Sequence, residues 1–262
     1  MNCSATTKAW LPFAKAGGHG ALRLFCFHHA GGGASLFSRW LKGLAPQVEV
    51  LPVQLPGHQE RLRERLHDRM PPLVDGLAEA LLPELDVPFA FFGHSMGGLI
   101  AFQLARVLRQ RHQLRPATLI VAGSPSPQGE RPGPLLHQLP DGELIDSVQK
   151  RFGGIPAAIA NHAEALRIFL PILRADLAVL ENYHCQSEAE LDCPILALAG
   201  TEDHCVSLAE VASWAKQTSA AFSLCTFPGG HFFLHDSVAG RAAVLRAVAG
   251  QLRLASKVFF HD

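Results

Sequence analysis

Short apolar runs recur along the chain, and stretches with helical spacing separate most of them. A continuous apolar run of this length is typical of a strand buried on both faces, as in a parallel sheet that helices cover on both sides. The alternation predicts an α/β protein with a mostly parallel, doubly wound sheet. We expect strands at 21–27, 48–55, 89–93, 117–123, 194–200 and 222–229, and helices at 34–45, 73–85, 99–110, 208–217 and 237–254.

The alternation breaks once. Between Ser124 and Asp192 there is no strand pattern, only loops rich in proline and glycine and two helical patterns at 141–152 and 162–183. A long insertion without strands between two strands of a sheet is typical of a helical lid over one edge. We therefore expect a single domain over 1–262 with a helical lid at about 126–190. The alternative is a peripheral helical extension with no gating role.

Composition narrows the classes of partner. Basic and acidic residues balance at 23 each, which argues against a surface for nucleic acid or for an anionic membrane. No apolar run approaches the ~18 residues of a membrane span, and the first residues lack the apolar core of a signal peptide. Six cysteines without a CxxC pair indicate reduced thiols in a cytoplasmic protein. Nothing in the sequence reports the oligomeric state, and a monomer is the starting expectation.

One serine lies in a setting typical of a catalytic nucleophile. Ser95 is the centre of Gly93-His94-Ser95-Met96-Gly97, directly after an apolar strand and directly before a helical pattern. This context predicts a sharp turn that exposes the serine, with glycines at the two places where side chains would collide. The helix that begins at Met96 would direct its N–H groups toward negative charge developing beside the serine. The alternative is a glycine-flanked turn with an incidental serine.

A serine hydroxyl needs a base that removes its proton. His231 fits this role by position, because FPGGHFFLH follows the last predicted strand and precedes the last helix. Open α/β sheets gather their functional groups at the carboxyl ends of strands. The alternatives are a solvated loop histidine, or a metal site shared with His235. The metal is disfavoured because HxxxH here lacks the glutamate of HExxH, so we expect none.

The base needs a carboxylate that holds its tautomer. Glu202 and Asp203 both follow the strand predicted at 194–200, and the spacing from Gly200 favours Asp203. The order Ser95, Asp203, His231 along the chain is that of the α/β-hydrolase arrangement. Glu202 remains the alternative carboxylate.

The Gly-rich segment HHAGGGAS follows the first predicted strand. Such a loop can bring backbone N–H groups to an oxyanion, and the amides of Ala30 and Met96 form the expected pair. A Gly-rich loop at this place can instead bind a dinucleotide. The fingerprint GxGxxG is absent, however, and no acidic residue ends the second strand, so we expect no cofactor.

Six segments follow one another in the order seen in one enzyme family: FHHAGGGASLF, VQLPGHQERL, FFGHSMGGLIAFQLA, LRADLAVLENY, LAGTEDHCV and PGGHFFL. From about residue 20 to 250, the chain resembles the type II thioesterases, free-standing editing enzymes of polyketide and nonribosomal peptide synthesis. The resemblance implies an α/β-hydrolase fold and hydrolysis of acyl groups from acyl or peptidyl carrier protein domains. The phosphopantetheine would then belong to the substrate.

The resemblance also assigns roles to individual residues. It implies that Ser95 is the nucleophile, His231 the base, Asp203 the orienting carboxylate, and Ala30 and Met96 the oxyanion donors.

One loop departs from part of that family and carries a run of charge. His58 follows Pro-Gly where many members have arginine and others also have histidine. An acidic carrier surface could dock on the arginines of this segment. Alternatively, the run is an ordinary solvated face with its own acidic partners. The arginines are Arg61, Arg63, Arg65 and Arg69, and the acidic residues are Glu60, Glu64 and Asp68.

Two other functions remain open on the sequence. A carboxylesterase or an acyltransferase can use the same scaffold and triad, because these do not determine the leaving group or the acceptor. A non-catalytic docking protein is the second alternative. The complete set of Ser95, Asp203 and His231 argues against it.

Overall fold

The structure is a computed structural model that describes residues 5–14, 21–44, 46–129, 134–153, 155–235 and 237–259. Within these residues one sheet has six strands in the order β2-β1-β3-β4-β5-β6, and every neighbouring pair is parallel. All six predicted strands are confirmed, although the second and last end earlier than expected. The strands are β1 (Leu22–Phe27), β2 (Val48–Pro52), β3 (Phe89–His94), β4 (Leu119–Ala122), β5 (Ile195–Gly200) and β6 (Phe222–Phe227).

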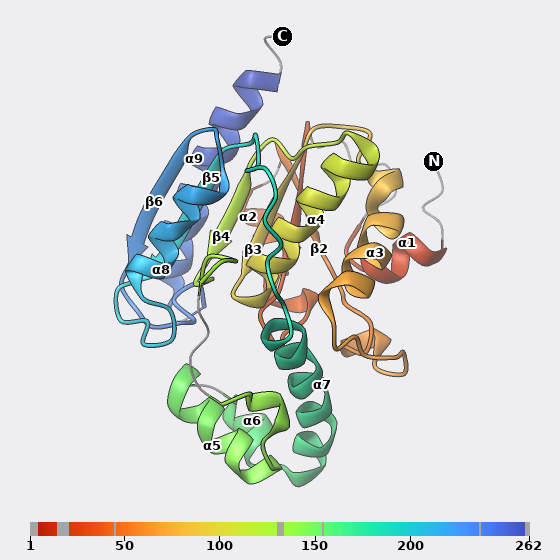
Figure 1. The fold of residues 1–262 in the computed structure, drawn as a ribbon, viewed down its shortest axis with the longest axis vertical. Coiled ribbons are helices and arrows are strands. Elements are labelled where there is room, and N and C mark those ends of the chain that lie inside the picture. Colours follow the sequence, from red (N-terminus) through yellow and green to blue (C-terminus); the bar gives the residue numbers. More distant parts are fainter. Residues whose placement is uncertain are drawn as a thin grey trace.

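Helices cover both faces of the sheet (Figure 1). Because successive strand residues point to opposite faces, Phe91 packs in one core and Phe92 in the other. This two-sided burial explains why the strands are continuous apolar runs. One face carries α1 (Ala5–Trp10), α3 (Met70–Leu81), α4 (Met96–His112) and α8 (Leu208–Ala212), and the other carries α2 (Trp40–Gly43) and α9 (Val238–Phe259).

Two predicted helices are each divided, and helix α1 was missed. The helix expected at 208–217 is α8 followed by a 3-10 turn at Ser213–Gln217. The single helix expected at 34–45 is a 3-10 turn at Ala34–Phe37 followed by the short helix α2. Phe37 and Trp40, one from each piece, both pack on Phe92, with ring centroids 5.8 and 4.7 Å away. This tertiary contact outweighs the local helical pattern. Helix α1 was not predicted, because its six residues are too few to show a helical period.

A helical insertion separates β4 from β5. Helices α5 (Asp141–Phe152) and α7 (Ala163–Glu181) confirm the two predicted helical patterns, and the short α6 (Ala157–Ala160) was not predicted. Figure 1 shows the three helices together at one end of the sheet, outside its two covering layers. They share a small apolar core of their own. This core consists of Leu136, Leu144, Val148, Ile155, Leu170, Leu173 and Leu177. Residues 130–133 and 154 of the expected lid lie outside the described residues.

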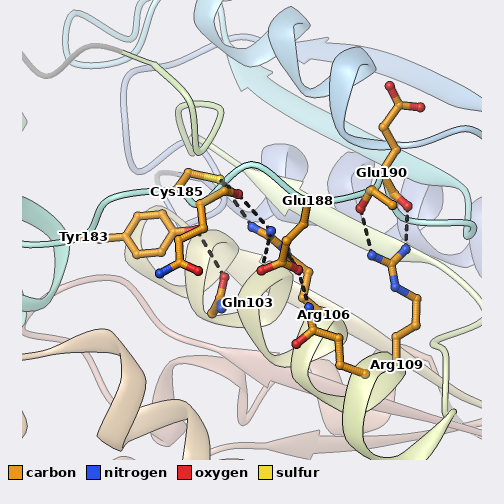
Figure 2. Close-up of polar contacts among 10 residues, drawn as sticks. Gln103, Arg106, Arg109, Tyr183, Cys185, Glu188 and Glu190 are labelled. Atoms are coloured by element: carbon orange, nitrogen blue, oxygen red, sulfur yellow. Dashed lines mark hydrogen bonds and ion pairs between the residues drawn. The ribbon is translucent and has the colours of Figure 1, made fainter.

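The segment that leaves α7 is fastened to α4 (Figure 2). The guanidinium of Arg106 is buried and forms two short contacts with the Glu188 carboxylate, 2.8 and 2.7 Å. Arg109 donates to backbone carbonyls at 189–190, and the Tyr183 hydroxyl donates to Gln103 over 3.2 Å. A buried charge with several acceptors holds its partners firmly. The segment that connects the insertion to β5 is therefore held against α4, one of the helices that cover the sheet.

None of the described helices combines the length and apolar character that crossing a membrane requires.

Candidate active site

The chain makes a sharp turn at Ser95, between β3 and α4. Ser95 has φ 53° and ψ −114°, a conformation that non-glycine residues rarely adopt outside functional sites. Only glycine fits on either side. A Cβ at Gly93 would lie 2.1 Å from the carbonyl oxygen of Gly97, and one at Gly97 would lie 2.2 Å from that of Phe27. The turn therefore has the geometry expected from the sequence, with the serine at its apex.

A chain of hydrogen bonds connects the three predicted triad residues. Nε2 of His231 lies 3.0 Å from Oγ of Ser95, and Nδ1 of His231 lies 2.9 Å from Oδ2 of Asp203. A carboxylate only accepts, so Nδ1 carries the proton and Nε2 is left to accept from the serine hydroxyl. The residues come from the turn after β3, the loop after β5 and the loop after β6. Parallel strands bring all three loops to one edge of the sheet.

The Asp203 carboxylate is held ionised by its neighbours. Burial raises the pKa of Asp203. Three effects lower it and outweigh burial: the hydrogen bond from His231, the charge of His231, and the hydrogen bonds from the amides of Cys205 and Val206. The pKa of Asp203 therefore lies below its ordinary value. These amides donate to Oδ1 over 2.8 and 3.1 Å. Glu202, the alternative carboxylate, is exposed, and in the described residues it forms no hydrogen bond or ion pair with His231. The geometry favours Asp203 as the orienting residue.

The predicted oxyanion donors are two backbone amides without acceptors. In the part of the chain that the structure describes, no group accepts a hydrogen bond from the N–H of Ala30 or of Met96. Met96 is the first residue of α4, where N–H groups have no partner within the helix. Ala30 and Ser95 line the same cavity. Both amides are therefore available to a ligand beside the serine.

The cavity has a volume of about 800 Å³ and lies between the helical insertion and the Gly-rich loop. Its walls are mostly apolar, and Ser95 is one of the residues that line it. Within the insertion, Leu135 is exposed and Leu144 is buried in the insertion's own core. The lining residues from the insertion include Val148, Phe152, Ile155, Ile159, Phe169, Ile172, Leu173, Leu177 and Leu180.

A family model for the thioesterase domain matches residues 22–252. The chain belongs to the thioesterase family. This confirms the resemblance noted from the sequence segments, and with it the α/β-hydrolase fold.

Relatives narrow the class of thioesterase. Thioesterase PikA5 of Streptomyces venezuelae is 42% identical over 82% of this chain and 76% of its own length. Gramicidin S biosynthesis protein GrsT of Aneurinibacillus migulanus is 38% identical over 97% of this chain and 98% of its own. The solved structure of the type II thioesterase BorB from the borrelidin biosynthetic cluster has a TM-score of 0.79 and 36% identity, covering 88% of this chain and 92% of its own. The chain is a type II thioesterase of polyketide or nonribosomal peptide biosynthesis, a class that acts on carrier-bound acyl groups.

Further histidines surround the candidate triad of this thioesterase. Nε2 of His94 donates to the backbone carbonyl of His231 over 2.9 Å, and the His29 ring packs edge-on against His94 at 5.2 Å. Burial lowers the pKa of His29 to about 4 and that of His94 well below its ordinary value. Both rings are therefore neutral at pH 7, and they add no positive charge beside His231.

Two groups of side chains in the described residues have the proximity that a metal requires. The potential ligand atoms of His28, His58 and Asp176 lie within 4.8 Å of one another, and so do those of Asp203, Cys205 and His231. In each group the carboxylate already accepts a hydrogen bond from a histidine. Asp203 and His231 of the second group belong to the candidate triad with Ser95, and we assign a metal to neither group.

Sequence analysis did not single out Asp176, and its expectation that Arg61 lies on the surface was wrong. Asp176 is buried and contacts both His58 and the Gly-rich loop; a charged residue on the apolar face of α7 was the available signal. Arg61 was expected on the docking face but is buried, with its guanidinium over Trp10 and bonded to Glu64. It is therefore unavailable to a partner, because the aromatic face and the carboxylate occupy it.

Proposed function

We propose that this thioesterase hydrolyses acyl thioesters of carrier proteins through a covalent intermediate on Ser95. In the first half-reaction, Oγ of Ser95 attacks the thioester carbonyl as Nε2 of His231 takes its proton. Asp203 stabilises the imidazolium that forms, and the amides of Ala30 and Met96 donate to the oxyanion. The carbon–sulfur bond then breaks, and His231 returns the proton to the departing thiol of the phosphopantetheine arm.

The second half-reaction releases the acid. A water molecule attacks the acyl-Ser95 ester while His231 removes its proton, and the same two amides stabilise the second oxyanion. The oxygen of Ser95 leaves with the proton from His231, which restores the free enzyme. The observation that carries the proposal is the unbroken hydrogen-bond chain from Ser95 to Asp203, opening into an apolar cavity.

Partner and setting form the finer part of the proposal. The phosphopantetheine arm would enter beside the Gly-rich loop, and the acyl chain would occupy the apolar cavity. With Arg61 buried, docking of an acidic acyl or peptidyl carrier domain falls to exposed residues of the same segment, and an ordinary solvated face remains the alternative. These exposed residues are Arg63, Arg65 and Arg69. We place the enzyme in the cytoplasm, in keeping with the five free cysteines among the described residues.

We assign the helical insertion as a lid within a single domain. Its helices provide most of the apolar wall of the cavity, so their position sets the space for the acyl chain. The segment 183–190 is fastened to α4, whereas α5 and α6 make few contacts with the sheet layers. Displacement of these helices would open the cavity without disturbing the sheet.

The decisive experiment compares kcat/KM for acetyl- or propionyl-carrier protein, the matching N-acetylcysteamine thioester and the matching p-nitrophenyl ester. Remote binding to the carrier should position the thioester, so the carrier-bound substrate should be turned over much faster than either small analogue. The Ser95→Ala variant sets the background for each substrate. Equal or faster turnover of the p-nitrophenyl ester would instead indicate a general carboxylesterase.

Two remaining alternatives have their own readouts. An acyltransferase would release little free acid and would transfer the acyl group to an added thiol or amine. A non-catalytic docking protein would bind the acyl carrier without turning it over.

A further inference from the structure

The carboxylate of Asp176 lies where three segments of the chain meet. Asp176 belongs to helix α7 of the insertion, and its Oδ2 accepts a hydrogen bond from the amide of Gly31 over 2.7 Å. The same oxygen lies 3.0 Å from Nε2 of His58. The side chains of His58 and Asp176 are only 3% and 4% exposed. One buried carboxylate therefore connects the insertion, the loop at His58 and the Gly-rich loop.

The contacts of His58 determine its protonation state. Nδ1 lies 2.9 Å from the carbonyl oxygen of Pro56, which can only accept, so Nδ1 carries a proton. Nε2 faces a carboxylate and must also donate. His58 is therefore an imidazolium, and the pair is a buried ion pair. Burial lowers the pKa of His58, but the charge of Asp176 and the hydrogen bonds outweigh it and raise the pKa above its ordinary value.

Packing also holds the Gly-rich loop, on one side from α7 and on the other from the segment after His58. Gly31 has φ +74°, and a Cβ there would lie 2.8 Å from the ring of Phe169 on α7. At Gly33 a Cβ would lie 2.4 Å from the side chain of Gln59, which donates to Oγ of Ser35 over 2.6 Å. The loop is therefore enclosed between α7 and the residues after His58, and the positive φ of Gly31 together with the Phe169 ring requires glycine at that position.

These contacts fix the two peptide groups that flank Ala30. In the peptide after it, the Ala30 carbonyl lies 2.9 Å from Nδ1 of His29, and the Gly31 amide donates to Asp176. In the peptide before it, the His29 carbonyl accepts from the Gly32 amide over 2.9 Å and lies 2.8 Å from Nδ1 of His28. The N–H of Ala30 is the one group of these two peptides without a partner in the described structure.

We propose that Asp176 and His58 are positioning residues that hold the Ala30 amide in place for the oxyanion and make that placement depend on the seating of helix α7. The inference rests on the proposed acyl-enzyme function. When α7 moves away from the Gly-rich loop, the Gly31 amide loses its acceptor and the peptide groups around Ala30 can rotate. Hydrolysis is then efficient only when α7 is seated against the Gly-rich loop.

The test compares Asp176→Ala with Glu181→Ala in the full-length enzyme. Glu181 also lies on α7 and forms a half-buried pair with His137, but it has no contact with the Gly-rich loop. Loss of one oxyanion donor lowers kcat by about 10²–10³, so a misplaced donor in Asp176→Ala should lower kcat on an acyl-carrier substrate by roughly 10–100-fold. KM should change less than about threefold, and Glu181→Ala should keep kcat within about threefold.

A second readout separates positioning from general damage. Attack of Ser95 on a fluorophosphonate passes through a five-coordinate phosphorus centre and expels fluoride. Negative charge builds up on the phosphoryl oxygen, which the same amides would stabilise, so the labelling rate in Asp176→Ala should fall in step with kcat. His58→Ala should show the same loss. His58→Arg, which keeps a cation beside Asp176, should recover most of the rate.

The outcomes distinguish the inference from the proposed function. Unchanged kcat and labelling in a folded Asp176→Ala enzyme would overturn the inference while leaving the acyl-enzyme mechanism intact. Full activity of Ser95→Ala would instead overturn the proposed function. An equal loss in Glu181→Ala would show that only the stability of the insertion matters, which also refutes the positioning role.

Discussion

The imidazole of His94 holds the backbone carbonyl of His231, with its Nε2 2.9 Å from that oxygen. His94 precedes the proposed nucleophile in the sharp turn, and His231 is the proposed base, so one hydrogen bond joins the two loops that must align. Both residues are buried. A buried carbonyl that loses its donor destabilises the fold by about 1–3 kcal/mol, which is enough to shift the His231 loop.

We therefore expect His94→Ala to lower kcat about tenfold, with a smaller change in KM. His94→Gln is the matched control, because its side-chain amide can donate from nearly the same position as Nε2, and it should keep most of the activity. Steady-state kinetics on a thioester substrate measures both variants. Equal activity of His94→Ala and the wild type would remove the positioning role of this hydrogen bond.

Ser95 should react once with a fluorophosphonate or sulfonyl fluoride. The turn exposes its hydroxyl, and His231 lies 3.0 Å away to take the proton. Intact-mass analysis should show a single adduct, which disappears in Ser95→Ala. If the alanine variant still becomes labelled, a different residue is the nucleophile.

Replacement of the orienting carboxylate should be severe and specific. Asp203→Asn removes the charge that stabilises the imidazolium and permits the wrong tautomer of His231, so kcat should fall by about 10³-fold or more. Glu202→Gln, at an exposed neighbouring position, should stay within about twofold of the wild type. The reverse pattern in single-substrate kinetics would identify Glu202 as the functional carboxylate.

The thioesterase should lose stability in mild acid. Burial and neighbouring histidines lower the pKa of His28 to about 3, and burial lowers that of His29 to about 4 and that of His94 well below its ordinary value. Below about pH 6.5, the unfolded chain therefore binds more protons at these histidines than the folded protein does. The free energy of unfolding is at its full value above about pH 6.5 and decreases as the pH falls below it. Each of the three histidines should lower the free energy of unfolding by about 1.4 kcal/mol for each pH unit of acidification between pH 6 and 4.

Urea unfolding at several pH values measures this slope. His28→Gln removes one of the three titrating groups and should make the loss of unfolding free energy visibly shallower. A free energy of unfolding that does not change between pH 7 and pH 5 would contradict the assignment of neutral buried rings.

Hydrogen exchange should separate the insertion from the sheet. Helix α6 packs mainly on α7, and α5 packs in the small core of the insertion, so local opening there should require less free energy than opening of β3 or β4. We expect amides of 141–152 and 157–160 to exchange faster than those of 89–94, with α4 as the slow helical control. Equal protection would make the insertion a fixed wall of the cavity.

Local signals explain how much of the fold could be predicted from the sequence. A strand buried on both faces is an uninterrupted apolar run, and each of the six runs forms a strand at its expected place. The turn at Ser95 has a similar local basis, because strand, glycines and helix lie within a few consecutive residues. The two long helices of the insertion follow from their apolar spacing.

By itself, the sequence determined the strands, the sharp turn at Ser95 and the family of the chain, since each depends on neighbouring residues or on segments in order. Only the tertiary structure decided which buried groups meet. Gly31 and Asp176 are 145 positions apart, and His58 and Asp176 are 118 apart. Such contacts depend on how the insertion packs on the loops of the sheet edge. The burial of Arg61 against the Trp10 ring has the same origin, because a charged run looks alike in sequence whether its side chains face water or a ring.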